Sequence, residues 1–176
     1  PAVAGYDLVN EPGAVKNSVT TSDIINFYKD AYQQIRKAEK ESNSNSNGHL
    51  IIFEVPWEEG KNYITNLGKP DSNWQNVVYS IHDYIWINNG AEMSQKIQYS
   101  TYDEMKKNFD ILFKDTIKYK NEYNVPIFIG EFSGMRPYSD GSQMWNYMMD
   151  SYDKNNINYA AWTYKAAYFD YMSLVY

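Results

Sequence analysis

Short apolar runs alternate with longer amphipathic stretches along this 176-residue chain, and that alternation limits the folds it can adopt. Each run spans only a handful of residues and is almost continuously apolar, which is typical of strands buried on both faces of a parallel sheet. The predicted strands are Val3–Val9, Leu50–Val55, Val77–His82, Ile127–Phe132 and Tyr159–Tyr164.

Helix patterns separate these strands. The first has Ile24 and Tyr28 on its apolar face and a capping residue at Thr21 or Ser22. The second begins at Thr101, which has capping-box spacing to the acidic residue three positions later. Repeated strand–helix units predict an α/β fold with a parallel sheet and outer helices, formed by residues 1–176 as one domain. The expected helices cover about 22–41, a stretch from 101 onward, and about 142–155.

Composition narrows the possible partners. The net charge of −6 and the pI near 4.9 argue against nucleic acid or an anionic membrane as a partner. No apolar run approaches the length of a membrane span, and the absence of Cys excludes disulfides and thiol chemistry. Aromatic residues make up 17% of the chain, with 18 Tyr and 5 Trp. Their flat apolar faces and polar edges suit sugar rings.

Two glutamates stand at strand ends. Glu11 follows the first predicted strand and Glu131 closes the fourth. A carboxyl group is costly in an apolar interior, so each is expected at a rim of the sheet. The carboxyl ends of barrel strands are where active sites of (β/α) barrels lie. Paired carboxylates around a scissile bond are the machinery of glycoside hydrolysis.

Four segments together carry a resemblance to a known family. They are Gly5–Pro12 (GYDLVNEP), His82–Tyr84 (HDY), Ile129–Phe132 (IGEF) and Ala161–Lys165 (AWTYK). In this order, each at the end of a strand, they resemble the motifs of glycoside hydrolase family 5, the cellulase family. The resemblance implies a partial (β/α)8 barrel of about five parallel strands, equivalent to strands 4 to 8 of the family's catalytic domain.

The resemblance also implies roles for individual residues. Glu11 is expected to be the general acid/base and Glu131 the nucleophile of a retaining double displacement. Asn10 would donate a hydrogen bond to the sugar 2-hydroxyl, and Tyr84 would orient Glu131. His82 would lie beside the acid/base. Trp162 would form the apolar floor beneath the sugar.

Further candidates lie near the same rim. Trp57 follows the second strand and would line a sugar subsite or close the barrel top. Trp86 would stack on sugar, and Lys165 would hydrogen-bond a sugar hydroxyl. Glu54 ends the second strand and is interpreted as a hydrogen-bonding residue inside the barrel. His49 lies at the opposite strand end and is interpreted as structural or exposed.

The expected substrate is β-1,4-glucan, cleaved without a metal or cofactor. The same motifs serve mannan, xyloglucan, β-1,3-glucan or a glycolipid, and an inactive sugar-binding or assembly fragment stays an alternative. The family's first three strands have no counterpart here, so an open sheet edge predicts a homo-oligomer or a complementary chain. The resemblance also implies export from the cell.

Overall fold

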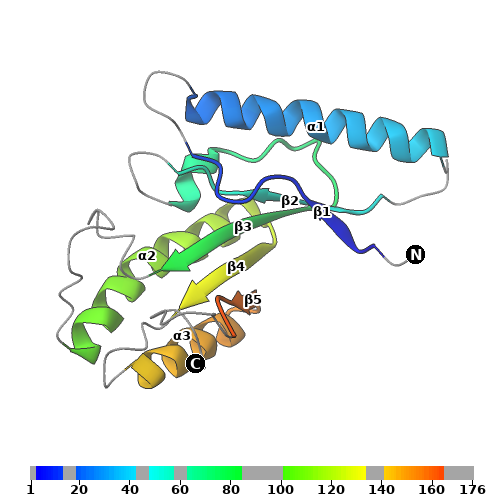
Figure 1. The fold of residues 1–176 in the computed structure, drawn as a ribbon. Helices are drawn as coiled ribbons and strands as arrows, with labels where there is room; N and C mark the ends of the chain where they lie inside the picture. The colour runs from blue at the N-terminus through cyan, green and yellow to red at the C-terminus, as the bar shows by residue number, and fades with distance from the viewer. Residues whose placement is uncertain are drawn as a thin grey trace.

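The computed structural model describes residues 3–13, 19–42, 48–57, 63–84, 101–133 and 141–164. They form a five-stranded sheet in the order β1-β2-β3-β4-β5, and every neighbouring pair is parallel. The α/β prediction is confirmed. Figure 1 shows the strands following one another across the sheet in chain order. The strands are β1 (Gly5–Asp7), β2 (Leu50–Glu54), β3 (Val77–Tyr84), β4 (Ile127–Ser133) and β5 (Asn158–Ala161).

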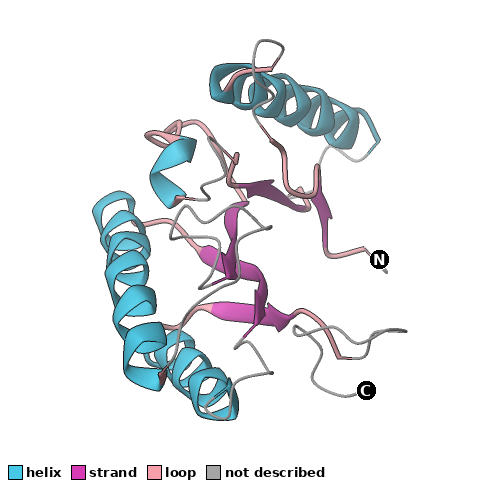
Figure 2. Cartoon of the chain, turned by 60° about the vertical axis from the view of Figure 1, so that its left-hand side comes forward, coloured by secondary structure: helices cyan, strands magenta, loops and turns pink. Residues whose placement is uncertain are grey.

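Three long helices connect consecutive strands and lie on the outer side of the curved sheet (Figure 2). They are α1 (Thr21–Ser42), α2 (Tyr102–Tyr123) and α3 (Gly141–Lys154), and a short 3-10 helix, η1 (Ile64–Leu67), lies between β2 and β3. Thr101 caps α2 as predicted, because its side chain accepts a hydrogen bond from the Glu104 N–H.

The cap of α1 differs from the prediction. Thr20, rather than Thr21 or Ser22, accepts the Asp23 N–H through its hydroxyl oxygen at 3.2 Å. The Asp23 carboxylate accepts the Thr20 N–H in return at 2.8 Å. This reciprocal pair is a capping box closed by an aspartate, which satisfies two backbone donors at once.

The core lies between the outer face of the sheet and the helices. Phe53 of β2 stacks on Tyr28 of α1 at 4.6 Å between ring centroids. Phe132 of β4 makes edge contacts with Trp145 and Tyr152 of α3. Burial of each such side chain contributes about 1.5–3 kcal/mol to the stability of the fold. Packing of the helices against the outer face therefore stabilises the sheet. Other fully buried members of this core are Ile51, Ile64, Met105, Phe109, Ile129, Met144 and Met148.

A β-bulge in β4 lies beside the strand end that carries Glu131. Ile81 pairs with Ile129, but the next residue of β3, His82, pairs with Glu131, so Gly130 is the extra residue. A Cβ on Gly130 would lie 2.6 Å from the Ser80 Oγ and 3.2 Å from the His82 Nε2. Glycine at this position therefore leaves room for the His82 ring on the inner face.

The two outer strands of the sheet are exposed. In β1, Tyr6 is exposed, and Leu50 of β2, which pairs with Gly5 of β1, is exposed as well. The described residues of β5 are also mostly exposed. Among the described residues, no helix is long and apolar enough to cross a membrane.

Candidate active site

Glu11 lies just beyond β1, where the chain turns towards the end of β2. Its backbone has a φ of 47°, in the left-handed region. The Glu11 N–H donates to the Glu54 Oε2 at 3.0 Å, and the Pro12 carbonyl accepts the Trp57 N–H at 2.8 Å. These two bonds tie the segment after β1 to the end of β2, so the Glu11 backbone is held while its side chain stays 40% exposed.

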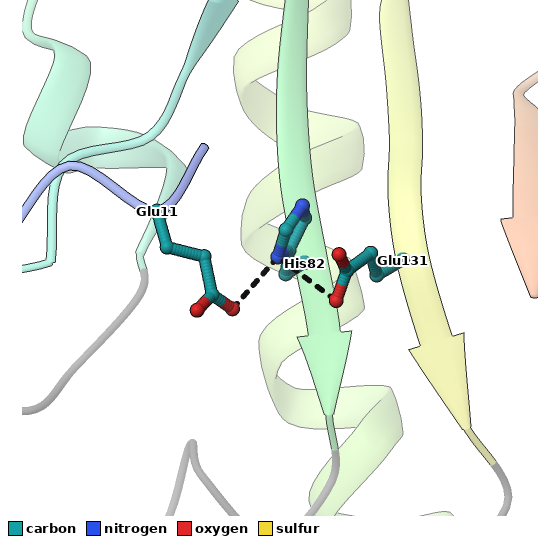
Figure 3. Close-up of side chains that lie close together, drawn as sticks. All are labelled: Glu11, His82 and Glu131. Atoms are coloured by element: carbon teal, nitrogen blue, oxygen red, sulfur yellow. Dashed lines mark hydrogen bonds and ion pairs between the residues drawn. The ribbon is translucent and has the colours of Figure 1, made fainter. Parts of the chain in front are cut away.

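His82 lies between the two predicted catalytic carboxyls. Its Nδ1 is 2.9 Å from the Glu11 Oε1 and 3.4 Å from the Glu131 Oε2. Figure 3 shows the His82 ring between the two carboxyl groups. The imidazole is only 3% exposed. Burial opposes its charge, but the hydrogen bond to Glu11 and the carboxylates of Glu54 and Glu131 outweigh that effect and raise the pKa of His82 above its usual value.

Tyr84 and Glu131 form the second half of the cluster. The Tyr84 hydroxyl donates to the Glu131 Oε2 at 2.5 Å, a short charge-assisted hydrogen bond. Strand β3 extends beyond its predicted end at His82 to Tyr84. Because side chains alternate along a strand, His82 and Tyr84 both lie on the inner face of the sheet. Asp83, between them, points the other way and accepts the Tyr152 hydroxyl at 2.9 Å among the helices.

Glu54 is the buried member of the cluster, with 1% of its surface exposed. Its Oε1 lies 3.1 Å from the His82 Nε2, and its Oε2 accepts the Glu11 N–H. Burial raises the pKa of Glu54 to about 7, although the Glu11 hydrogen bond and the positive His82 oppose that shift. Sequence reasoning placed Glu54 inside the barrel, but its contacts with both Glu11 and His82 could not be found without the register of the strands.

The remaining predicted site residues are placed less tightly. Asn10 is exposed next to Glu11, and Trp57 is half-buried after β2. Trp162 follows β5 with 46% of its surface exposed, and its backbone N–H donates to the Phe132 carbonyl at 3.0 Å. Trp86 and Lys165 lie outside the described residues. The structure thus brings together Glu11, His82, Tyr84, Glu131 and Glu54.

Three members of this cluster, Glu11, His82 and Glu131, are the His and carboxylate residues among those described that lie close enough together to hold a metal ion. One ligand atom each from Glu11, His82 and Glu131 lie within 4.8 Å of one another. These atoms already contact one another through hydrogen bonds and ion pairs. The cluster needs no ion to account for its geometry.

A parallel α/β sheet with two carboxyls facing each other at its strand ends is the arrangement of carboxylate-pair sites in (β/α)-barrel proteins. The family model for cellulase (glycosyl hydrolase family 5) matches residues 1–168. The chain belongs to this family. No curated protein matches the chain in sequence.

Solved structures of similar fold include Thermotoga maritima Cel5A in complex with mannotriose, with a TM-score of 0.68 and 18% identity, covering 97% of this chain and 54% of that one. The Cel5A complex with cellobiose also has a TM-score of 0.68, with 19% identity over the same shares of the two chains. Endo-glycoceramidase II from Rhodococcus sp. has a TM-score of 0.65 at 16% identity, covering 94% of this chain and 37% of that one.

This chain therefore spans about half the length of the solved Cel5A structures that it matches. The likeness confirms the fold prediction, a partial (β/α)8 barrel whose five strands form a curved half. At these identities it shows the fold alone, so the roles of individual side chains depend on the geometry of the cluster.

Proposed function

We propose that this chain carries the catalytic residues of a retaining glycoside hydrolase. One observation carries the proposal: a carboxylate oxygen of Glu11 and one of Glu131 lie within 4.8 Å of each other. Retaining enzymes hold their carboxyl groups about 5–5.5 Å apart, whereas inverting enzymes leave about 6.5–9.5 Å for a water molecule. The observed approach favours direct attack by one carboxylate on the sugar.

The proposed reaction has two steps. Glu131 attacks the anomeric carbon while protonated Glu11 gives its proton to the departing glycosidic oxygen, leaving a glycosyl ester on Glu131. Water then attacks that ester after giving a proton to Glu11, which releases the sugar and restores the Glu131 carboxylate. The Tyr84 hydroxyl, bonded to Glu131, fixes the orientation of the attacking group.

Three other residues complete the proposed sugar site. Asn10 would donate to the 2-hydroxyl, a hydrogen bond that strengthens as the transition state forms. The exposed ring of Trp162 would provide an apolar floor for the sugar, and Trp57 would border a subsite at the end of β2. Trp86 and Lys165 keep their predicted sugar contacts as part of the same proposal.

We propose β-1,4-glucan as the substrate, cleaved outside the cell. The strand-end motifs are shared with enzymes for other β-glycans, and the similar structures include a Cel5A complex with mannotriose and one with cellobiose. Mannan therefore stands as the nearest alternative. Comparing initial rates on carboxymethylcellulose and on galactomannan separates the two substrates.

Completion of the barrel belongs to the same proposal. The inner face carries the half-buried apolar residues Ile52, Val78 and Phe128, and outer strand β1 is exposed. Exposed strand edges and apolar inner faces pair readily with further strands. We propose that a second copy or a complementary chain covers them. Light scattering on the purified chain, with hydrolysis assayed on the same peak, tests whether the active species is larger than one chain.

A mechanism-based inhibitor tests the catalytic assignment. When the protein reacts with 2-deoxy-2-fluoro-cellobiosyl fluoride, the Glu131 carboxylate is expected to displace fluoride, and the resulting glycosyl ester is hydrolysed slowly. Peptide mass spectrometry should then find the sugar on Glu131, and a Glu131→Gln variant should bind cellotetraose without labelling. Binding without any label would instead favour a sugar-binding fragment without activity.

A further inference from the structure

Glu54 has an arrangement that the proposed two-carboxylate reaction does not by itself require. The side chain is 1% exposed, yet both of its oxygens face polar groups of the site. Oε2 accepts the Glu11 N–H at 3.0 Å, and Oε1 lies 3.1 Å from the His82 Nε2. Among the described residues the buried Oε1 accepts no hydrogen bond, so its 3.1 Å approach to the His82 Nε2 is an ion-pair contact. One buried carboxyl thus contacts the backbone of one site residue and the ring of another.

We propose that Glu54 is a positioning residue of this site, which holds the Glu11 backbone and the Nε2 edge of His82 at the same time. This proposal rests on the proposed function, because the placement of the Glu11 backbone and the His82 ring matters only if Glu11 and Glu131 are the catalytic residues. With Nε2 held by Glu54, the ring presents Nδ1 to the two carboxyls, at 2.9 Å from Glu11 and 3.4 Å from Glu131.

A carboxylate suits this position better than an amide. The Glu11 N–H and the His82 Nε2–H are both donors, and a carboxylate supplies an acceptor oxygen to each. A glutamine has one oxygen and one NH₂ group, so it can accept from only one of them. Because the Glu11 N–H cannot change its character, glutamine would turn its NH₂ towards His82 and force Nε2 to become an acceptor.

The groups around Glu54 support a proton held on His82 Nε2. Asp7 of β1 and Glu11 repel the negative charge of Glu54, while His82 of β3 attracts it. On the α1 side, the Tyr28 hydroxyl donates to the Glu54 backbone carbonyl at 2.7 Å rather than to its carboxyl. His82 is therefore the group that offsets the buried charge of Glu54, through its positive charge when protonated and through the Nε2–H when neutral.

This placement has a consequence for both chemical steps. Glu11 gives up and regains a proton, and Glu131 loses its charge while it carries the sugar. The His82 Nδ1 touches both groups, so its protonation can follow these changes only if Nε2 keeps its own proton. Glu54 would thus confine the exchangeable proton to the edge of the ring that faces the substrate.

The two histidines of this chain allow a direct test. Long-range ¹H–¹⁵N spectra of ¹⁵N-histidine-labelled protein report the tautomer of each ring. We expect neutral His82 to carry its proton on Nε2. His49, whose Nδ1 lies 2.8 Å from the Glu39 Oε1, should carry it on Nδ1. A His49→Asn variant assigns the two signals.

The Glu54→Gln variant should move the His82 proton to Nδ1 and lower its titration midpoint by about one unit, the effect of removing a nearby opposite charge. Asp83→Asn is the matched control, because Asp83 is also buried but faces Tyr152 and the helices. It should leave the His82 tautomer and midpoint unchanged.

A neutral His82 with its proton on Nδ1 in the unsubstituted protein would overturn the proposal, even if Glu54→Gln failed to fold. So would a Glu54→Gln spectrum unchanged from the parent, or an equal shift in Asp83→Asn. The proposed function is decided separately by glycosyl labelling at Glu131. If His82 shows the expected tautomers but Glu131 is not labelled, the proposed hydrolysis is refuted and the positioning role of Glu54 stands.

Discussion

At the scale of single residues, the bond between Tyr84 and Glu131 gives the sharpest test of the proposed nucleophile. Tyr84→Phe removes the hydroxyl that donates to the Glu131 Oε2 at 2.5 Å. A hydrogen bond to a charged group contributes about 1.5–3 kcal/mol, so kcat/KM on an aryl cellobioside should fall by about 10- to 100-fold. The measurement is the initial rate at matched enzyme concentration.

A second tyrosine provides the control. Tyr147 donates to the Asp110 Oδ1 at 2.6 Å on the surface of α2 and α3, away from the cluster. Tyr147→Phe loses the same kind of bond and should keep its rate within about twofold. Equal losses in both variants would show that the effect of Tyr84→Phe is structural, and the proposed orienting role would be wrong.

The bulge residue Gly130 leads to a further prediction. In Gly130→Ala the new methyl would lie 2.6 Å from the Ser80 Oγ and 3.2 Å from the His82 Nε2. Overpacking of this kind costs about 1–3 kcal/mol, and displacement of His82 should lower activity as well. Adding Ser80→Ala removes the closest atom and should recover part of the stability, as measured by urea unfolding. No recovery would contradict the steric explanation.

Much of the site was predictable from the sequence, because Glu11 and Glu131 each stand at the end of an apolar run and the segment His82–Tyr84 resembles a motif of the family. Their mutual distances were not predictable. They depend on the bulge at Gly130, which shifts the pairing of β4 against β3, and a strand pattern does not reveal an inserted residue. The contacts of Glu54 with Glu11 and His82 depend instead on the register of β2 against β1 and β3, which the sequence does not give either.

At the scale of elements, two neighbouring threonines at the start of α1 should differ in how much they stabilise the helix. Thr20→Ala removes the hydroxyl that accepts the Asp23 N–H and should lower the free energy of unfolding by about 1 kcal/mol. Thr21→Ala is the control, because the Thr21 Oγ1 is buried without a hydrogen-bond partner among the described residues. Urea unfolding followed by circular dichroism compares them. A larger loss for Thr21→Ala would reverse the assignment of the cap.

Element types were predicted better than element bounds. Strand β3 extends to Tyr84 although Asp83 is charged, because the Tyr152 hydroxyl donates to the Asp83 carboxyl on the helix side. That partner is distant in sequence and leaves no local signal. The start of α1 was placed at the wrong threonine because Thr20, Thr21 and Ser22 all have cap-forming side chains.

At the scale of the whole molecule, the order of the five parallel strands follows from repeated strand–helix units, since such connections place consecutive strands side by side. The same units leave the outer edge of β1 and the outer edge of β5 without a paired strand among the described residues. Glu54 and His82 lie buried on the inner side of the sheet, and Asp83 lies buried on the helix side. These three titratable groups make the free energy of unfolding depend on pH.

Glu54, Asp83 and His82 all have a raised pKa in the folded state. Burial raises the pKa of Glu54 to about 7 and that of Asp83 to about 6, from ordinary values of 4.5 and 3.8. The neighbouring carboxylates raise the pKa of His82 despite its burial. A group with a raised folded pKa stabilises the fold below its unfolded pKa and loses that contribution as pH rises through the folded pKa.

Glu39 acts in the opposite direction. Burial disfavours its charge, but hydrogen bonds from His49 and the contact with Arg36 outweigh this and lower its pKa to about 2. Its contribution is present above its ordinary value of 4.5 and disappears as pH falls towards 2. The free energy of unfolding should therefore peak near pH 4.5 and decline towards neutral pH.

Urea unfolding between pH 4 and 8, followed by tryptophan fluorescence, measures this decline. Glu54→Gln and Asp83→Asn each replace one titrating carboxyl by a neutral amide, so each should flatten the decline between about pH 4.5 and 7. Glu41→Gln is the control, because Glu41 is exposed and lies 4.0 Å from Lys37 in a surface ion pair. Stability that rises from pH 5 to 8 in the parent chain would mean that Glu54 and Asp83 are ionised in the folded state without the cost that their burial implies.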